Sequence, residues 1–285
     1  MTKLAFVYND KNERCRELMQ RVADYAVSRG AELMMNGDCC GFSIENLSDG
    51  DFPEAECAVC DAAVVFGGDG TMLAATRRFS LCETPLFCVD LGRVGFLSSV
   101  KPEEIFPAID RPLAGDYTVR DRMMISCGIR RNDQLLLTCN AFNDFTVRSS
   151  LYSRAVFLSL LIDHHPVYHF HGDGLIVATP TGSTGYSLSA GGPIVMDDIK
   201  SMLITPVCAQ SLVARPIVVA ADSEIEIVCH GNADSSALTA DGQFRIALAD
   251  QDRVLIGAAA HQAHIIYFDG VDFFARIREK LFHMD

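Results

Sequence analysis

Positive charge is scarce in this sequence. The 285 residues include 24 lysines and arginines against 37 aspartates and glutamates, which gives a formal net charge of −13 at pH 7. This balance argues against a broad phosphate-neutralising face of the kind that binds DNA or RNA. It says nothing against a local pocket of backbone N–H groups that binds a small anion. We therefore expect small-molecule partners and no nucleic acid.

Long apolar runs and a disulfide pattern are also lacking. No apolar stretch reaches the ~18–20 residues of a membrane-spanning helix, and the apolar run at the start of the sequence is too short for a signal peptide. The 11 cysteines are an odd number and are scattered along the chain, unlike the paired framework of a small secreted domain. We expect a cytoplasmic protein with reduced thiols and no membrane partner.

Several common catalytic signatures are missing as well. The sequence has no GxxxxGKS/T loop of the Walker type and no GxGxxG dinucleotide fingerprint. It also has no GxSxG segment, so its serines are poor candidates for a hydrolase nucleophile.

The apolar periodicity divides the chain into two parts. Up to about residue 115, strand-like runs alternate with helical spacing: the strands are 4–8, 62–66 and 85–89, and the helices are 11–29 and 72–79. This order is typical of an open, mostly parallel, Rossmann-like α/β sheet. Short strands separated by turn residues then indicate a β-rich unit. We expect an α/β domain at 1–118 and a β-rich domain at 119–268, with a final helix at 269–285 packing on the first.

The sharpest signal is the segment Gly67-Gly68-Asp69-Gly70-Thr71, which follows an apolar run and precedes helical spacing. Glycines let a ligand approach the backbone closely, and backbone N–H groups at a helix start can bind phosphate oxygens. A carboxylate beside phosphates is unfavourable unless it binds Mg²⁺ or takes a proton from a hydroxyl. The alternative is a structural turn in which Asp69 caps the helix.

A second signal lies in residues 172–193. An apolar strand at 175–178 leads into a glycine- and hydroxyl-rich loop, and a short helix follows that Gly191 and Gly192 close. Such a loop offers many hydrogen-bond donors and acceptors in a small space. The alternative is a helix start that is rich in serine and threonine for capping alone.

In this order, the two motifs resemble those of the NAD kinases. That family combines a GGDGT loop, an NE dipeptide and a TPTGSTAY-type loop that runs into SLSAGGPI. The corresponding residues here are 67–71, Asn143-Asp144 and 179–194, and family-like segments also occur at 92–97, 214–217 and 241–243. Because GGDGT is shared with diacylglycerol and sphingosine kinases, the second loop is the specific part.

The resemblance implies a phosphotransferase. An NAD kinase transfers the γ-phosphoryl group of ATP to the 2′-hydroxyl of the adenosine ribose of NAD, which gives NADP. The resemblance also implies a divalent metal ion such as Mg²⁺, held through phosphates and at most by Asp69 on the protein side. It further implies a homo-oligomer, a dimer or tetramer, in which neighbouring subunits complete the site.

The resemblance also assigns roles to residues. Asp69 corresponds to the aspartate that orients and deprotonates the 2′-hydroxyl. An aspartate near its ordinary pKa is a weak base, so we expect positioning and charge stabilisation to dominate. The predicted phosphate- and ATP-binding residues are Gly67, Gly68 and Thr71. The predicted NAD-binding residues are Gly70, Phe96, Asn143, Asp144, Asp173, Thr184, Gly185, Tyr186 and Ser189.

Within this set, Asn143 would bond an adenine edge, Asp144 the ribose hydroxyls and Asp173 an NH₂ group of NAD. The sequence departs from the family pattern at some of these positions. Asp144 replaces a glutamate and is one methylene shorter, and Gly185 replaces an alanine. Residues 208–210 read Cys-Ala-Gln where the family has a CPH-like stretch, so no histidine role carries over there.

Two other groups of residues favour structural interpretations. Residues 164–171 hold four histidines, of which His169 and His171 share one strand face, and we expect surface or interface histidines rather than a metal site. Cys57 and Cys60 form a CxxC without a second pair to complete a zinc site.

Two alternative functions remain open. A lipid or small-alcohol kinase of the GGDGT group would need an apolar acceptor pocket and would lack the TPTGST loop. A non-catalytic NAD(P)-binding sensor would have lost the loop aspartate, whereas Asp69 is present. Both alternatives are therefore less favoured than an NAD kinase.

Overall fold

The computed structural model describes most of the chain. The described residues are 1–8, 12–35, 60–91, 95–97, 100–150, 155–211, 213–231, 236–268 and 273–282. Cys57, residues 92–94 and both ends of the expected final helix lie outside them. The described residues form two units: the first runs to Arg122 and resumes at Gln262, and the second spans Met123–His261.

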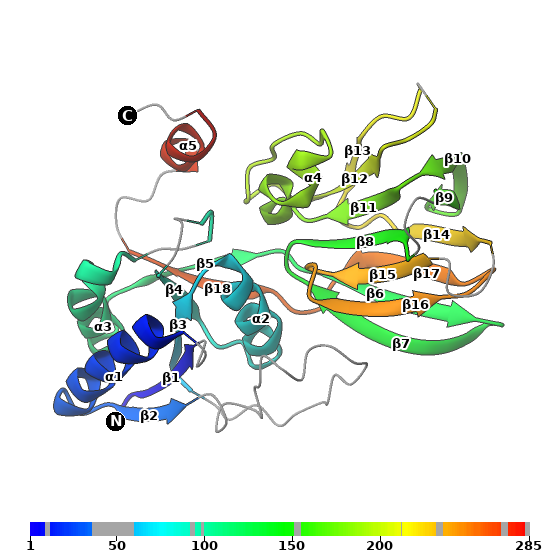
Figure 1. The fold of residues 1–285 in the computed structure, drawn as a ribbon. Coiled ribbons are helices and arrows are strands. Elements are labelled where there is room, and N and C mark those ends of the chain that lie inside the picture. Colours follow the sequence, from blue (N-terminus) through cyan, green and yellow to red (C-terminus); the bar gives the residue numbers. More distant parts are fainter. Residues whose placement is uncertain are drawn as a thin grey trace. The chain divides into compact units, whose positions relative to one another are not determined.

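The first unit is built on one six-stranded sheet (Figure 1). Its strands, in spatial order, are β2 (Glu32–Met35), β1 (Lys3–Tyr8), β3 (Ala62–Gly67), β4 (Leu86–Asp90), β18 (Ala263–Tyr267) and β5 (Thr118–Arg122). The strands from β2 to β18 run parallel, and only β5 pairs antiparallel. Strands buried on both faces explain the continuous apolar runs of the sequence.

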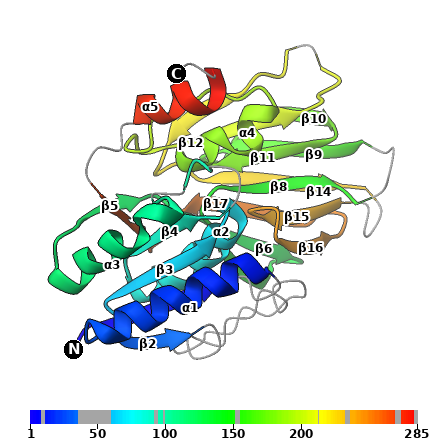
Figure 2. The same ribbon diagram turned by 60° about the vertical axis from the view of Figure 1, so that its left-hand side comes forward.

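Helices cover both faces of this sheet. On one face, α1 (Glu13–Ser28) and α3 (Ile105–Ala114) share an apolar cluster with Leu4 and Phe6 of β1, and Figure 2 shows both helices along the sheet. Ala5 and Val7 alternate to the opposite face, where α2 (Asp69–Phe79) contacts β1, β3 and β4. The shorter helices of this unit are η2 (Ser80–Cys82), η3 (Pro102–Glu104), α5 (Phe273–Ile277) and η5 (Arg278–Phe282).

The second unit consists of two antiparallel six-stranded sheets. One has the order β10 (His165–Gly172), β9 (Val156–Ile162), β14 (Ile225–His230), β17 (Arg253–Ala258), β6 (Ile125–Arg131) and β7 (Gln134–Ala141). The other has the order β13 (Ile217–Ala220), β12 (Ser201–Val207), β11 (Gly174–Ala178), β8 (Asp144–Ser149), β15 (Ser236–Ala240) and β16 (Phe244–Leu248). Inward side chains of both sheets form one core, as in a sandwich. Two short helices, η4 (Thr181–Thr184) and α4 (Tyr186–Ser189), follow β11.

The units differ from the expected domain limits at two strands. β5 crosses the expected boundary at residue 118, and β18 lies inside the expected β-rich domain, yet both belong to the first sheet. β18 fills the place between β4 and β5. Its short apolar pattern indicates a strand but not the sheet that the strand joins, so periodicity alone could not place it.

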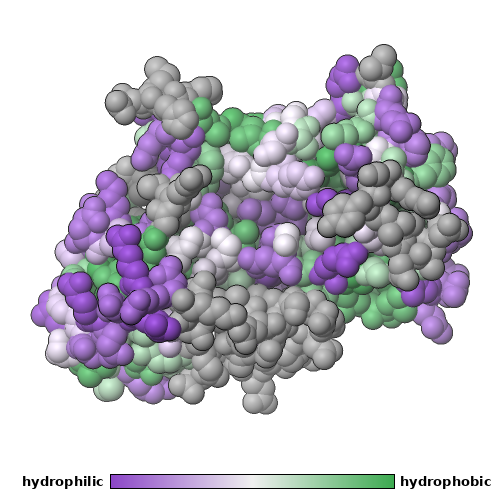
Figure 3. Space-filling model, viewed as in Figure 1, coloured by the Kyte–Doolittle hydropathy of each residue, from purple (hydrophilic) through white to green (hydrophobic). Residues whose placement is uncertain are grey.

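The surface is mixed in character. On the face shown in Figure 3, hydrophilic residues alternate with smaller apolar areas. Among the described residues, no helix is long and apolar enough to cross a membrane.

Candidate active site

Asp69 stands at the first position of α2, directly after β3. Gly68 precedes it in an extended conformation, and no side chain caps this helix start. The Asp69 carboxylate instead accepts hydrogen bonds from the backbone N–H groups of Phe96, at 3.2 Å, and Leu97, at 3.3 Å. The alternative in which Asp69 merely caps the helix is therefore wrong, because its side chain turns to residues 95–97.

The surroundings of Asp69 make it more basic than expected. Burial raises the pKa of Asp69 above its ordinary value, against the lowering effect of the two backbone N–H groups. The positive charge of Lys280 lowers it and the negative charge of Asp90 raises it. The expectation of an aspartate near its ordinary pKa thus needs correction, because burial of the carboxylate outweighs its hydrogen bonds.

Three glycines near Asp69 differ in the space around them. A Cβ on Gly95 would overlap the Asp69 carboxylate, so only glycine allows this close approach. A Cβ on Gly67 would meet the Thr71 side chain, whereas a Cβ on Gly68 would have nothing within 4 Å. Of the predicted phosphate-binding residues, Gly68 therefore offers open space, and Gly67 and Thr71 pack on each other.

In the second unit, Asp241 fixes the turn that carries Asn143 and Asp144. Its carboxylate accepts hydrogen bonds from the backbone N–H groups of Phe142, at 3.1 Å, Asn143, at 2.7 Å, and Asp144, at 3.1 Å. The Asp241 N–H donates to the Asp144 carbonyl at 2.9 Å in return. Residues 241–243 form one of the family-like segments, but the sequence assigned no role to Asp241. The structure shows that the Asp241 carboxylate holds the turn at residues 142–144.

The Asp144 side chain is only 5% exposed. Burial and the nearby negative charge of Asp241 raise the pKa of Asp144 to about 7, although a hydrogen bond from the Thr146 hydroxyl, at 3.1 Å, acts in the opposite direction. The side-chain oxygen of Asn143 is also buried, and it has no hydrogen-bond partner among the described residues. Since buried acceptors are nearly always paired, this oxygen is a candidate ligand contact.

The glycine- and hydroxyl-rich loop packs directly on this turn. The Thr179 hydroxyl donates to the Phe142 carbonyl at 2.7 Å and accepts from the Gly182 N–H at 3.0 Å. A Cβ on Gly182 would overlap the backbone of Asn143. The Thr184 hydroxyl donates to the Thr181 carbonyl at 3.2 Å. The loop is therefore partly structural, because several of its hydroxyls bond its own backbone.

A cavity of about 300 Å³ opens beside this turn. It is lined by Asn143, Asp144, Thr146, Arg148, Tyr186, Thr239, Asp241 and Gly242. Three of the predicted NAD-binding residues, Asn143, Asp144 and Tyr186, thus meet at one cavity. Gly185 adjoins it, since a Cβ there would lie 3.4 Å from the Asn143 amide nitrogen.

Asp173 lies outside this lining, in the exposed turn between β10 and β11. Its carboxylate accepts a hydrogen bond from the Cys208 thiol, whose pKa is raised as a result. Beside it, His171 Nδ1 lies 2.7 Å from Gln210 Oε1. At residues 208–210, where the sequence differs from the family pattern, Cys208 and Gln210 therefore form hydrogen bonds with the two residues on either side of Gly172.

Two further histidines, His169 of β10 and His230 of β14, lie beside Ser159 of β9. The Ser159 hydroxyl lies 2.9 Å from His169 Nδ1 and 2.7 Å from His230 Nε2, and the Phe157 ring contacts both histidines. In the part of the chain that the structure describes, no group of three or more metal-ligating side chains is placed to hold an ion.

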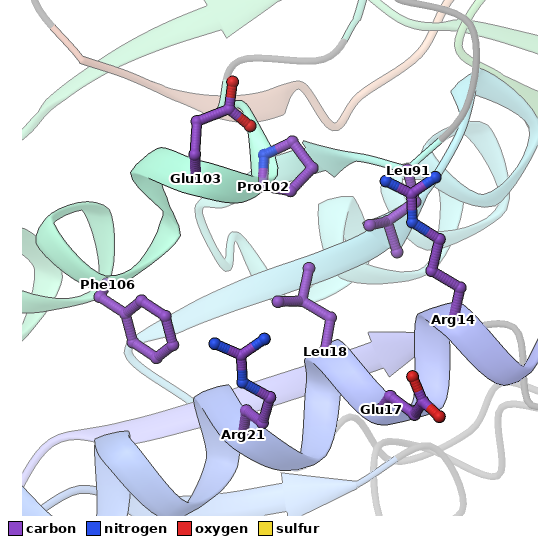
Figure 4. A pocket seen from close by; sticks show the side chains of 8 residues that line it. All are labelled: Arg14, Glu17, Leu18, Arg21, Leu91, Pro102, Glu103 and Phe106. Carbon is purple, nitrogen blue, oxygen red and sulfur yellow. The ribbon is translucent and has the colours of Figure 1, made fainter.

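A larger cavity of about 540 Å³ lies in the first unit, between α1, α3 and the end of β4 (Figure 4). Arg21 projects from α1 toward Phe106 of α3, with its guanidinium carbon 5.7 Å from the ring centre. The complete lining is Arg14, Glu17, Leu18, Arg21, Leu91, Pro102, Glu103 and Phe106. Two arginines and two glutamates balance one another, so this lining does not select one class of ligand, and no predicted site residue belongs to it.

Comparison with known proteins decides the family. Residues 4–117 match the model of the ATP-NAD kinase N-terminal domain, and residues 143–268 match that of the C-terminal domain. The NAD kinase of Moorella thermoacetica is 34% identical over 284 residues, which cover 99% of this chain and 89% of that protein. The chain belongs to the NAD kinase family. An NAD kinase of a Geobacter species is 40% identical over 225 residues, or 79% of this chain and 78% of that protein.

Solved structures confirm the NAD kinase fold. Yeast NADH kinase complexed with NADH superposes with a TM-score of 0.84 at 21% identity and covers 100% of this chain and 88% of that chain. An NAD kinase from Archaeoglobus fulgidus in complex with ATP superposes with a TM-score of 0.76 at 24% identity, and the match covers 100% of both chains. The expected family and the expected fold, an α/β unit and a β-rich unit, are therefore confirmed.

Proposed function

We propose that this chain transfers the γ-phosphoryl group of ATP to the 2′-hydroxyl of the adenosine ribose of NAD, with Asp69 as the catalytic residue. Membership of the NAD kinase family supports the reaction. The observation that carries the assignment of Asp69 is its carboxylate, which burial makes basic and two backbone N–H groups orient. A half-buried, oriented carboxylate with a raised pKa suits a general base.

In the transfer, the 2′-oxygen forms a bond to the γ-phosphorus while the bond from that phosphorus to the bridging oxygen breaks. The electron pair of the broken bond leaves with ADP, and the hydroxyl proton passes to Asp69. Phosphoryl transfer depends mainly on positioning and charge stabilisation. The open space at Gly68, at the start of α2, suits a phosphate that approaches the backbone closely.

The residues around Asp69 also fit a divalent ion such as Mg²⁺. This ion prefers oxygen ligands and often combines one or two carboxylates with substrate phosphates. Asp69 and Asp90 lie close enough for their charges to interact, so we propose that Asp69 is the protein group nearest the ion and that ATP supplies most ligands. When bound, the ion would neutralise charge on the phosphoryl oxygens.

The cavity of the second unit is the proposed site of the adenosine part of NAD. The orphaned Asn143 oxygen can accept from an adenine NH₂ group, and Asp144 can bond the ribose hydroxyls. Tyr186 lines the same cavity. Gly70, Phe96, Asp173, Thr184, Gly185 and Ser189 stay proposed NAD-binding residues on the strength of the family motifs alone.

The test is NADP formation from NAD, ATP and Mg²⁺ by the wild-type protein and by Asp69→Asn. Asp61→Asn is a matched control, because Asp61 precedes the other end of β3 and is exposed. We expect product from the wild type and from the control, and almost none from Asp69→Asn. Near-normal turnover by Asp69→Asn would remove the proposed base, and a wild type without product would contradict the reaction itself.

We also propose a homo-oligomer, a dimer or tetramer. Sedimentation velocity at the protein concentration of the assay measures this directly. A monomer that is fully active would contradict it. The lipid-kinase alternative is not favoured, because the matching relatives are NAD kinases.

A further inference from the structure

Strand β8 carries a row of polar side chains along the cavity of the second unit. Phe145 and Val147 pack in the core between the two sheets. Because side chains alternate along a strand, Asp144, Thr146 and Arg148 lie on the opposite face, and all three line the cavity. Four residues of strand separate the carboxylate from the guanidinium, which corresponds to about 13 Å between their Cα atoms. The cavity therefore has an acidic end and a basic end.

The strands on either side of β8 leave room around the Arg148 side chain (Figure 1). On β11 its partner is Gly174, where an added Cβ would lie only 3.0 Å from the Arg148 Cβ. On β15 its partner is Ala237. Arg148 thus stands between two small residues, and its side chain is exposed. A ligand in the cavity can reach the guanidinium without moving a large neighbour.

The charge of Arg148 is not used by the carboxylates of the cavity. Arg148 forms no hydrogen bond or ion pair with another residue that the structure describes. A guanidinium bound to Asp144 would lower the pKa of that carboxyl group. Burial and the charge of Asp241 instead raise this pKa to about 7. Arg148 therefore remains available for a negatively charged ligand.

Further donors lie on the same face of the sheet. Thr239 of β15 pairs with Thr146 in register and adds a hydroxyl group to the cavity lining. Arg245 of β16 pairs with Thr239 on its other side, and it is exposed on this face because Phe244 packs in the core. In a chain with a net charge of −13, two exposed arginines near one hydroxyl favour an anion at this end of the cavity.

We propose that Arg148 is a specificity-determining residue that binds the diphosphate of NAD. The inference rests on the proposed function, which places the adenosine part of NAD in this cavity. The groups of the cavity then follow the order of the groups in the nucleotide: the Asn143 amide at the adenine, the Asp144 carboxylate at the ribose hydroxyls and the Arg148 guanidinium at the diphosphate. A planar guanidinium can donate to two phosphate oxygens at once. The site should therefore bind NAD more tightly than adenosine, which lacks the diphosphate.

The experiment measures the Kd for NAD, ATP and adenosine by calorimetry, with adenosine read from its displacement of NAD. It compares the full-length wild type with Arg148→Met and Arg148→Lys. Arg148→Met should weaken the binding of NAD about tenfold or more, because charge-assisted hydrogen bonds are lost, and should change that of adenosine less than twofold. Arg148→Lys keeps the charge without the planar fork, so we expect a loss of roughly two- to fivefold for NAD. Arg130→Met is the control, because Arg130 is exposed on β6 of the other sheet.

The outcomes separate this inference from the proposed function. An unchanged Kd of Arg148→Met for NAD overturns the inference, as does an equal loss for NAD and adenosine or for Arg130→Met. A loss confined to ATP also overturns it, because the guanidinium would then bind the phosphates of ATP. A wild type that binds NAD but forms no NADP contradicts the proposed function, and the binding data still test Arg148. If Arg148→Met shows no thermal transition, Arg148→Lys decides, and its unchanged Kd for NAD contradicts the inference.

Discussion

Asp69 is a half-buried carboxylate of the first unit, and Asp144 is a buried carboxylate of the second. The surroundings of the two groups differ. Asp69 accepts two backbone N–H groups and experiences the positive charge of Lys280. Asp144 lies beside the negative charge of Asp241, and its pKa rises to about 7. The comparison shows that burial alone does not define a functional carboxylate. Burial raises the pKa of both groups, and the donors and charges around each carboxylate then oppose or add to that effect.

This difference assigns the two groups to different tasks. Burial raises the pKa of Asp69, which suits a base for a hydroxyl, while its two hydrogen bonds and the positive charge of Lys280 act in the opposite direction. Asp144 changes charge near neutral pH, so its part of the site is expected to respond to pH in binding rather than in chemistry.

The largest effect is expected from removing each carboxylate in turn. Asp69→Asn should lower kcat by about 10³-fold or more, because it removes the base and its charge with little change of shape. Asp144→Asn should lower kcat less than tenfold and act mainly on the KM for NAD. Steady-state kinetics with both substrates measures the two effects. Equal losses of kcat in both variants would show that the two carboxylates act together in the chemical step.

Two glycine substitutions test the same separation through the backbone. Gly95→Ala would push a methyl group into the Asp69 carboxylate, and Gly182→Ala would push one into the backbone of Asn143. We expect Gly95→Ala to lower kcat by about 10²-fold, since small misplacements in an active site are costly. Gly182→Ala should instead raise the KM for NAD and lower the melting temperature. A raised KM with normal kcat in Gly95→Ala would contradict this assignment.

Gly68→Ala examines whether a ligand approaches the GGDGT turn. No protein atom lies within 4 Å of the added methyl group, and the φ of Gly68 is −98°, which any residue can adopt. The melting temperature should therefore stay within a few degrees of the wild type, while the KM for ATP rises about tenfold. Thermal unfolding and kinetics at varied ATP concentrations provide the two readouts. An unchanged KM for ATP would place the phosphates elsewhere.

The sequence predicted most of the central strands of the first unit and the glycine-rich motifs of both units. The apolar runs gave β1, β3 and β4 nearly to the residue, because strands buried on both faces carry continuous apolar stretches. The GGDGT turn was found because its glycines lie between a strand and a helix. The apolar pattern could not show that β18 joins the first sheet, because it indicates a strand but not the strand with which it pairs.

Contacts between distant segments of one unit also escaped the sequence. Asp241 and the turn at residues 142–144 lie almost 100 residues apart, and only the structure shows the three hydrogen bonds between them. Gly95 belongs to the family-like segment 92–97, but only the structure shows its closeness to the Asp69 carboxylate. The raised pKa values of Asp69 and Asp144 follow from burial, which no local motif reports.

The smallest effect on turnover is expected from the titration of Asp144, which acts on the stability of the fold. Below pH 7 the folded protein holds a proton on Asp144, whereas the unfolded chain takes one up only near pH 4. The folded state therefore binds more protons between these values, and the free energy of unfolding should fall as pH rises from about 4 to 7. Asp144→Asn cannot bind this proton, so its free energy of unfolding should not fall in this way. As pH rises from about 4 to 7, the variant should therefore gain stability relative to the wild type, by on the order of a few kcal/mol. Thermal unfolding at several pH values measures the difference, with the exposed Asp222→Asn as control. A constant difference from pH 4 to 8 would show that Asp144 titrates as an ordinary aspartate, and the contrast with Asp69 would then rest on the hydrogen bonds and the positive charge beside Asp69.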